Sequence, residues 1–390
     1  MTTPASAAPP SRLDSLTSLR FFAAAAVVIV HLQAAFDLPY IIEEVASLGY
    51  VGVTFFFVLS GFVLTWTAKP GDAARLFYSR RFARIWPAHV AVIALAVPVI
   101  YLAGKKIVWG ALPFVLTLTQ LWIPSKEWRN AFNPPAWSLA AEVFFYALFP
   151  FLIRVARWQQ QRLRCLAVTT VAMMAISALA VVSLAPDVAW GYLLVTNPLY
   201  RLGEFILGML LAIAMRRGWR ASWPTWLAAA GCVFPYLALL MFAPHDSMGN
   251  VPRFLTNLAL LPFFLAIIAA AATADIKGRR TLLRKRSLVI LGDRSFALYL
   301  IHWQLILVLE AGVAGRTLNP TASLALAIGL LAASVGAAHL LYVAVERPAE
   351  RRLRSFLTRR LAKPRSIDEG WLDSQGAGNV VMVSNSRSLV

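Results

Sequence analysis

Ten long apolar segments dominate this chain of 390 residues and restrict it to one class of fold. A helix rises about 1.5 Å per residue and a bilayer core is about 30 Å thick, so roughly 20 apolar residues span the membrane. Such segments lie at 20–37, 48–68, 87–103, 137–153, 165–186, 194–215, 224–243, 254–274, 288–310 and 321–345. We therefore predict an all-α, polytopic membrane helical bundle with about ten transmembrane helices.

The composition excludes an ordinary soluble protein. Hydrophobic residues make up 59% of the sequence and charged residues only 14%, whereas a soluble domain carries about 25% charged residues. The net charge of +19 is also typical of nucleic-acid-binding proteins. Here, however, the basic residues are dispersed over short loops between apolar segments rather than gathered on one soluble domain. We therefore expect membrane lipid, and no nucleic acid, as a partner.

The basic loops determine the topology of the chain. A further apolar stretch at 107–123 is interrupted by Pro113 and is ambiguous by length. Lys and Arg accumulate in cytoplasmic loops, and the basic loops fall on one side of the membrane only if this stretch does not cross. They lie at 69–86, 154–164, 216–220 and 277–286 and from Arg347 onwards. We predict that 107–123 is a re-entrant or interfacial helix on the outer side.

This topology places both termini in the cytoplasm and the bundle in the cell inner membrane. We divide the chain into an N-terminal segment (1–19), a transmembrane domain (20–348) and a tail (349–390) that is basic and then disordered. The two cysteines, Cys165 and Cys232, have no metal-ligand spacing and offer no disulfide framework, so we expect no metal.

Arg20 and His31 stand out in the first apolar segment. On a helix the imidazole lies roughly 16 Å deeper than the guanidinium, which places it near the middle of the bilayer. An ionisable group there costs on the order of 2.5 to 3.5 kcal/mol, so it indicates a functional site. His31 is accordingly the first candidate for a catalytic residue.

Other polar groups in the apolar segments occur in short strings. GVTFFFVLSGF contains Ser60, which either hydrogen-bonds across a helix interface or serves close packing. In RRFARIWP, Arg81 and Arg84 share a helix face and form either a clamp for phosphate or a positive-inside anchor. In FNPPAWSLAAEVFFYALFP, Ser138 and Glu142 share a face, and Glu142 belongs either to a proton relay or to a structural ion pair.

Two further strings lie nearer the C-terminus, followed by the last apolar segment. Arg201 and Glu204 of RLGEF share a helix face, where they neutralise each other. SFALYLIHW places Tyr299 and His302 on one helical stripe with Ser295, and we expect them to bind the acceptor or to form structural hydrogen bonds. The last apolar segment ends in VAVERP, which contains Glu346.

Together and in this order, the strings resemble the acyltransferase-3 family of integral membrane O-acyltransferases, which acylate sugars, lipids and some antibiotics. The resemblance extends from Arg20 to Pro348. It implies a cytoplasmic acyl-CoA donor, acetyl-CoA by default, with Arg20 and His31 as essential residues. It also implies that Arg81 and Arg84 bind the nucleotide phosphates. Some members carry a fused SGNH-type domain, whereas here a short tail follows Pro348, so we expect the stand-alone form.

Acyl transfer requires a base, for which His31 is the candidate, with Arg20 and Glu142 as further catalytic residues. The acceptor hydroxyl attacks acyl-CoA directly or takes the acyl group from an acyl-imidazole on His31; we favour direct attack. Acceptor-binding or supporting roles are expected for Ser60, Trp137, Ser138, Arg201, Glu204, Tyr299 and His302.

The expected acceptor is a sugar of an exported polysaccharide or glycolipid, which suggests association with polysaccharide export or synthesis enzymes. Trp122, Trp128 and Trp137 offer stacking surfaces for sugar rings, although an interfacial aromatic belt explains them equally well. A small hydrophobic acceptor, such as a macrolide antibiotic, is the alternative. A proton-coupled secondary transporter is the rival class, but no inverted repeat is visible in the sequence.

Overall fold

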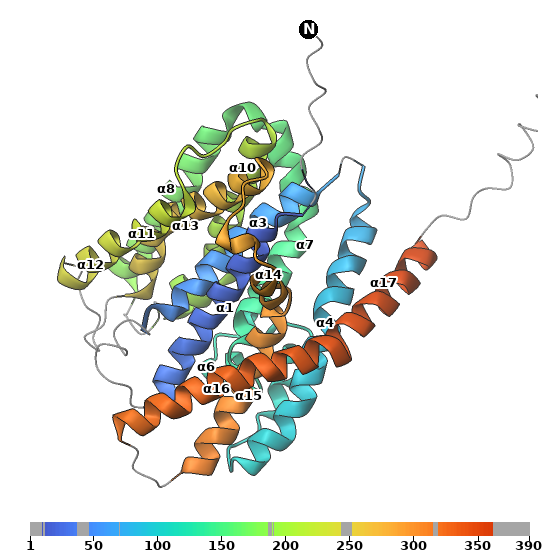
Figure 1. Cartoon of the computed structure of the whole chain (residues 1–390), viewed down its shortest axis with the longest axis vertical. Coiled ribbons are helices and arrows are strands. Elements are labelled where there is room, and N and C mark those ends of the chain that lie inside the picture. The colour runs from blue at the N-terminus through green and yellow to red at the C-terminus, as the bar shows by residue number, and fades with distance from the viewer. Residues whose placement is uncertain are drawn as a thin grey trace, which may run out of the picture.

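The computed structural model describes residues 10, 12–36, 47–69, 71–185, 189, 191–242, 252–314 and 319–361. Its regular elements in these residues are helices (Figure 1). The long ones are α1 (Asp14–Ala35), α3 (Val51–Thr67), α4 (Ala74–Leu102), α7 (Ala136–Trp158), α8 (Leu163–Leu184), α10 (Pro198–Arg216), α13 (Arg253–Ile276), α15 (Ser295–Val313), α16 (Pro320–Leu341) and α17 (Arg347–Leu361). The short ones are η1 (Leu48–Tyr50), η2 (Trp109–Ala111), α5 (Leu112–Leu116), η3 (Gln120–Trp122), α6 (Lys126–Arg129), η4 (Gln160–Arg162), η5 (Gly191–Thr196), α11 (Thr225–Ala230), α12 (Val233–Phe242), η6 (Leu282–Arg284), α14 (Arg286–Asp293) and η7 (Tyr342–Glu346).

The predicted polytopic helical bundle is confirmed. Within the described residues, 8 helical segments are long and apolar enough to cross a membrane. Two shorter apolar segments, Val51–Thr67 and Thr225–Leu239, occupy the two remaining predicted positions. The predicted span at 288–310 is interrupted, because α14 ends at Asp293 and α15 begins at Ser295.

The ambiguous stretch at 107–123 does not form a transmembrane helix. It folds into η2, α5 and η3, each far too short to cross a bilayer. Leu118 has φ 56° and Phe132 has φ 61°, a left-handed conformation that is uncommon for side chains of this size. Between α4 and α7 the chain thus forms only short helices joined by irregular backbone, as expected for a re-entrant or interfacial segment.

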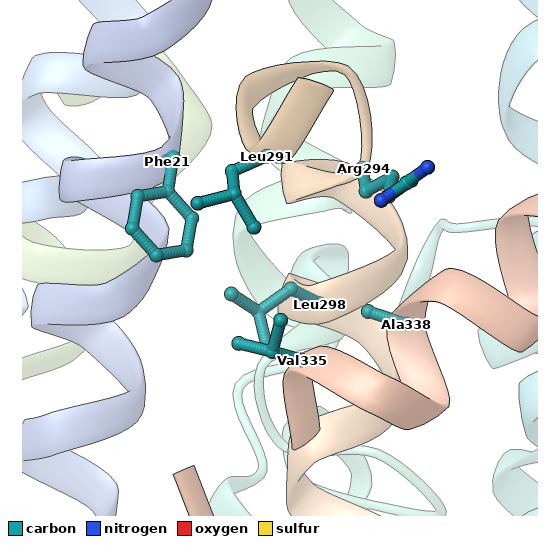
Figure 2. Close-up of a pocket in the computed structure, with 6 residues that line it drawn as sticks. All are labelled: Phe21, Leu291, Arg294, Leu298, Val335 and Ala338. Atoms are coloured by element: carbon teal, nitrogen blue, oxygen red, sulfur yellow. The ribbon is translucent and has the colours of Figure 1, made fainter. Parts of the chain in front are cut away.

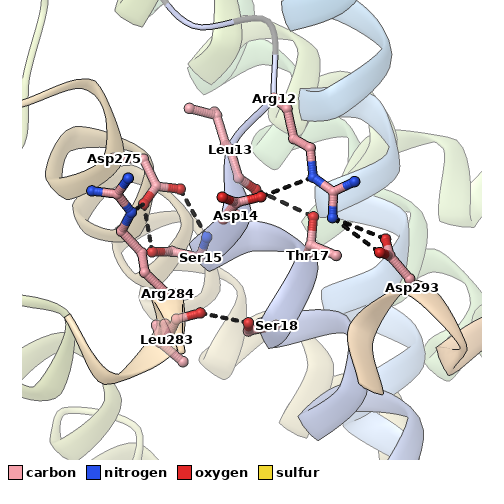
Figure 3. A network of polar contacts seen from close by, with 10 residues as sticks. All are labelled: Arg12, Leu13, Asp14, Ser15, Thr17, Ser18, Asp275, Leu283, Arg284 and Asp293. Carbon is pink, nitrogen blue, oxygen red and sulfur yellow. Dashed lines mark hydrogen bonds and ion pairs between the residues drawn. The ribbon is translucent and has the colours of Figure 1, made fainter. Parts of the chain in front are cut away.

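The first helix begins earlier than predicted, at Asp14. Its N-cap residue, Leu13, has no side-chain acceptor. Asp275, in the last turn of α13, instead accepts hydrogen bonds from the backbone amide and the hydroxyl of Ser15 (Figure 3). Six residues of the predicted N-terminal segment thus belong to α1, and His31 lies in the last turns of this helix rather than in its middle.

The basic loops meet at one end of the bundle, which we call the basic end. Arg12 binds both carboxylate oxygens of Asp293 at 3.1 Å, which joins the start of α1 to the end of α14 (Figure 3). Arg157 and Arg216 donate to the carbonyl of Ala68, just after α3, at 3.1 and 2.7 Å. These contacts agree with the predicted alternation of the basic loops.

Helices α3 and α10 are the most closely packed pair in the bundle. A Cβ atom at Gly61 would overlap the carbonyl oxygen of Phe205, and one at Gly208 would overlap that of Val58. The two glycines therefore allow the backbones to touch. Helices α1, α7, α8 and α13 pack against this pair, and α16 and α17 run obliquely across α15 and α4 (Figure 1). The predicted tail begins inside α17, and residues 362–390 lie outside the described residues.

Candidate active site

His31 of α1 and His302 of α15 form a direct pair. His31 Nδ1 lies 3.0 Å from His302 Nε2, and the two rings stack with centroids 5.2 Å apart. His302 is fully buried, whereas His31 is partly exposed. The ring of Trp303 makes a T-shaped contact with the His31 ring, with centroids 5.4 Å apart. The structure thus brings together two histidines predicted from separate strings.

A small cavity lies between α1, α14, α15 and α16, and Leu298, one turn before His302, is among the residues that line it. Its volume of about 10 Å³ leaves room for one water molecule. Figure 2 shows the apolar side chains turned toward one another. The lining residues are Phe21, Leu291, Arg294, Leu298, Val335 and Ala338. Since the cavity is too small for an acyl chain, we assign no substrate to it.

Three arginines from two helices gather nearer the basic end. Arg20 of α1 lies within electrostatic range of Arg84 and Arg81 of α4 and of Glu142 of α7. Arg84 is neutralised, because its Nη1 lies 3.1 Å from Glu346 Oε1 and 3.0 Å from Glu350 Oε2. Glu346 is 1% exposed, so this contact compensates a buried carboxylate.

Arg81 differs from Arg84 although both stand on one face of α4. Among the described residues, neither Arg81 nor Arg20 forms an ion pair. The Arg81 guanidinium lies over the rings of Phe77 and Tyr146 at 5.9 and 6.0 Å, and its buried Nε has no hydrogen-bond partner. Two guanidinium groups without an ion-pair partner among the described residues therefore face this region, a suitable arrangement for binding an anion.

Glu142 is held by hydrogen bonds rather than by an ion pair. Ser60 donates to Glu142 Oε1 at 2.5 Å, and the hydroxyl of Tyr146 donates to the same oxygen. Ser60 and Tyr146 also contact each other at 3.2 Å. The predicted face shared by Ser138 and Glu142 does not make them partners, because Ser138 bonds elsewhere.

Ser138 and Tyr299 form a second buried contact. Their hydroxyl oxygens lie 2.6 Å apart, and Tyr299 also donates to the carbonyl of Pro135 at 3.0 Å. Tyr299 contacts the ring of His302 edge-on, with centroids 6.0 Å apart. These bonds fix the start of α7 against α15 next to the histidine pair. The third member of the predicted stripe, Ser295, instead donates to the carbonyl of Gly292.

Arg201 and Glu204 form the local ion pair that their spacing predicts. Arg201 Nη1 lies 3.0 Å from Glu204 Oε1, and each side chain is 1% exposed. Arg201 also donates to Thr54 Oγ1 at 3.0 Å and lies over the ring of Phe57. The pair is enclosed between α3 and α10.

The three predicted tryptophans do not share one surface. Trp137 packs edge-on against Phe57 inside the bundle, with centroids 6.3 Å apart. Trp128 contacts Phe114, whereas Trp122 is 49% exposed beside Phe144. Of the three, Trp122 has the free face that sugar stacking would require.

Three residues of these networks were missed in the sequence. Tyr146 could have been found, because it lies four residues after Glu142 on the same face of α7. Thr54 and Glu350 carry no local signal, since their partners Arg201 and Arg84 are distant in the sequence. No group of three or more His, Cys, Asp or Glu residues converges in the part of the chain that the structure describes.

Comparison with known proteins identifies the family of the chain. The model of the acyltransferase-3 family, described as an acyltransferase domain, matches residues 13–343. Acyltransferase MdmB of Streptomyces mycarofaciens is 35% identical over 369 residues, which cover 88% of this chain and 92% of MdmB. O-acetyltransferase OatA of Staphylococcus aureus is 26% identical over 341 residues, or 76% of this chain and 51% of OatA.

A peptidoglycan O-acetyltransferase OatA from Listeria monocytogenes is 27% identical over 164 residues, which cover 37% of this chain and 25% of that protein. The chain thus matches about half or less of the OatA proteins and nearly all of MdmB. No solved structure matches it. The family match covers most of the transmembrane bundle, including both histidines and all three clustered arginines. The chain therefore belongs to the acyltransferase-3 family and is a multi-pass membrane O-acyltransferase.

Proposed function

We propose that this enzyme transfers an acyl group, acetyl by default, from acyl-CoA to a hydroxyl of a sugar, with His31 as the general base. The observation that carries the proposal is the arrangement along α1. Arg20 and His31 lie on one helix, roughly 16 Å apart at 1.5 Å per residue. That separation is comparable with the length of an extended pantetheine arm, which links the CoA phosphates to the thioester.

The donor phosphates are proposed to bind at the arginine cluster. Arg81 and Arg20 have no acidic partner within ion-pair distance among the described residues, and guanidinium groups suit phosphate recognition. Arg84 borders the same region, but Glu346 and Glu350 already neutralise it. In this assignment Arg81 and Arg20 contact the phosphates, and Arg84 chiefly holds α4 against α17.

Direct transfer needs one proton carrier. The acceptor hydroxyl oxygen attacks the thioester carbonyl while His31 Nε2 removes the hydroxyl proton. The tetrahedral intermediate then expels the CoA thiolate, which receives that proton from the imidazolium. The products are an ester and CoA thiol. Glu142 lies within electrostatic range of Arg20 and is proposed to position that guanidinium, with Ser60 and Tyr146 holding the carboxylate.

A sugar acceptor is supported by the similarity to the Listeria relative, which is a peptidoglycan O-acetyltransferase. The half-exposed Trp122, which packs against Phe144 of α7, offers one stacking face. A small hydrophobic alcohol, for example a macrolide, is the second candidate. The observation that favours an acceptor other than peptidoglycan is the higher and more extensive similarity to MdmB than to OatA.

The charge distribution supports one orientation of the bundle in the membrane. The basic end carries the loops rich in Arg and Lys, which favour the cytoplasmic side. We propose that this end faces the cytoplasm of a cell inner membrane, with both termini on that side and acyl-CoA entering there. A sugar acceptor would reach the His31 end of α1 from the opposite side, supplied by polysaccharide synthesis or export enzymes.

The proposal is tested with the purified full chain in nanodiscs and acetyl-CoA labelled in its acetyl group. Acceptors are peptidoglycan fragments, a lipid-linked oligosaccharide and a macrolide, each in a separate reaction. Label transferred to one acceptor by wild type, and lost with His31→Ala, is the expected result. Transfer that His31→Ala retains in full would remove His31 as the base. Label in the macrolide alone would select the second acceptor. Thioester consumption that is equal with and without the wild-type protein would exclude both acceptors.

A further inference from the structure

We infer that His302 is a positioning residue that fixes the tautomer of His31 and leaves His31 Nε2 free to accept a proton. The inference rests on the proposed function, because it concerns the base of that reaction. It follows from a chain of three groups: the Leu298 carbonyl, the His302 ring and the His31 ring.

The first link fixes the hydrogen on His302. Its Nδ1 lies 3.1 Å from the carbonyl oxygen of Leu298, one turn earlier on α15. A carbonyl oxygen can only accept, so Nδ1 must carry the hydrogen. A neutral imidazole has one N–H group, and His302 Nε2 is therefore an acceptor.

The second link transfers this constraint to His31. Its Nδ1 lies 3.0 Å from His302 Nε2. Because His302 Nε2 accepts, the hydrogen between the rings belongs to His31 Nδ1. In the neutral His31 ring the lone pair then resides on Nε2, the nitrogen that a general base needs.

Burial separates the roles of the two rings. His302 has no exposed surface and lies among Leu298, Tyr299 and His31. His31 is partly exposed, so a substrate can reach it but not His302. The bond between α1 and α15 also restricts rotation of the His31 ring, as the edge of Trp303 does from another side.

The same bond supports the transition state. When Nε2 of His31 takes the hydroxyl proton, its ring becomes positive while Nδ1–H still donates to His302 Nε2. The lone pair of His302 therefore stabilises the positive ring until the proton passes to the CoA thiolate. No proton needs to move to His302.

Two substitutions at one position separate positioning from packing. His302→Gln places an amide oxygen where Nε2 accepted, so His31 keeps its tautomer. His302→Leu fills the volume without an acceptor. We expect His302→Leu to lower kcat by about 10- to 100-fold with an unchanged KM for acyl-CoA, since misoriented bases lose this much or more. We expect His302→Gln to stay within about threefold of wild type.

His89 of α4 offers a matched control. It is also fully buried, and its Nε2 contacts the carbonyl of Val115 at 2.9 Å, but it has no contact with His31 among the described residues. His89→Leu measures the cost of losing a buried imidazole and should leave kcat within about threefold. Variants are compared only where their melting temperatures in nanodiscs match.

A spectroscopic readout tests the tautomer without turnover. In ¹⁵N NMR spectra of full-length protein with labelled histidine, His31 should show a protonated Nδ1 and an unprotonated Nε2. In His302→Leu the His31 hydrogen should be shared between Nδ1 and Nε2. The His31 signals are assigned as those that are absent from the spectrum of His31→Ala. A His31 hydrogen on Nε2 in wild type would overturn the inference, as would equal kcat values for wild type and His302→Leu. Wild type without any acyl transfer would refute the proposed function instead, while the nitrogen signals would still decide the tautomer.

Discussion

Asp275 caps the first helix although it lies 260 residues further along the sequence, because its carboxylate accepts hydrogen bonds from both the amide and the hydroxyl of Ser15, at 2.8 and 2.6 Å. The N-cap position of α1, Leu13, supplies no acceptor. The carboxylate also complements the positive end of the α1 dipole. The helix that carries Arg20 and His31 is thus anchored to the last turn of α13.

Asp275→Ala should therefore destabilise the protein by about 2 kcal/mol, the usual cost of a lost cap together with an unpaired buried donor. Unfolding of the nanodisc-embedded protein, followed by tryptophan fluorescence, measures the loss. The control is Asp14→Ala, since that carboxylate is 40% exposed and pairs with an exposed arginine. It should cost less than about 0.5 kcal/mol. Equal losses for both variants would contradict the capping role.

Arg81→Ala and Arg84→Ala should have different effects although the two residues share one face of α4. Arg81 has no acidic partner among the described residues, so its loss should raise the KM for acyl-CoA about tenfold, which corresponds to about 1.4 kcal/mol of phosphate binding. The stability of the Arg81→Ala variant should differ little from that of wild type. Arg84→Ala leaves the buried Glu346 unpaired and should lower the stability by about 3 kcal/mol.

Steady-state kinetics and thermal unfolding of the same two preparations separate these effects. Adding Glu346→Gln to Arg84→Ala removes the unpaired charge and should recover part of the lost stability. An unchanged KM for Arg81→Ala would mean that this arginine does not bind the donor phosphates and serves only as a positive-inside anchor.

The sequence predicted those parts of the molecule that depend on local pattern. The apolar segments and the alternating basic loops suffice to place the helices, since both reflect transfer of each segment into the bilayer. The Arg201–Glu204 pair could also be predicted, because residues three apart share a helix face. Local rules failed at the start of α1, where Leu13 gives no capping signal and the acceptor lies 260 residues away.

The partners within the candidate site could not be predicted in the same way. His31 and His302 are separated by 271 residues, and Ser60 and Glu142 by 82. Their contacts depend on how two helices are rotated and shifted relative to each other. Small residues such as Gly61 permit that register, but a sequence pattern does not say which helix approaches.

Gly208→Ala should be strongly destabilising because its added methyl group overlaps the carbonyl oxygen of Val58 on α3. A backbone atom cannot move aside without separating the two helices, so we expect a loss of about 2 to 3 kcal/mol. Gly329→Ala on α16 is the matched control, since a Cβ there meets no atom within 4 Å. It should be neutral or slightly stabilising, because alanine favours helix. The comparison uses urea unfolding in one detergent, and equal stability of the two variants would contradict the close approach.

Arg201→Met should cost about 3 to 5 kcal/mol, because it leaves the carboxylate of Glu204 buried and without its cation. Removing both charges should be far less damaging, since an uncharged pair avoids the cost of burying a charge. We therefore expect the double variant Arg201→Met, Glu204→Gln to recover most of the stability of wild type. A double-mutant cycle of unfolding free energies measures the coupling.

Because Arg201 contacts Thr54 and Phe57 rather than His31 or the arginine cluster, a stable double variant should retain acyl transfer. Loss of transfer despite restored stability would instead assign this pair a direct part in acceptor binding.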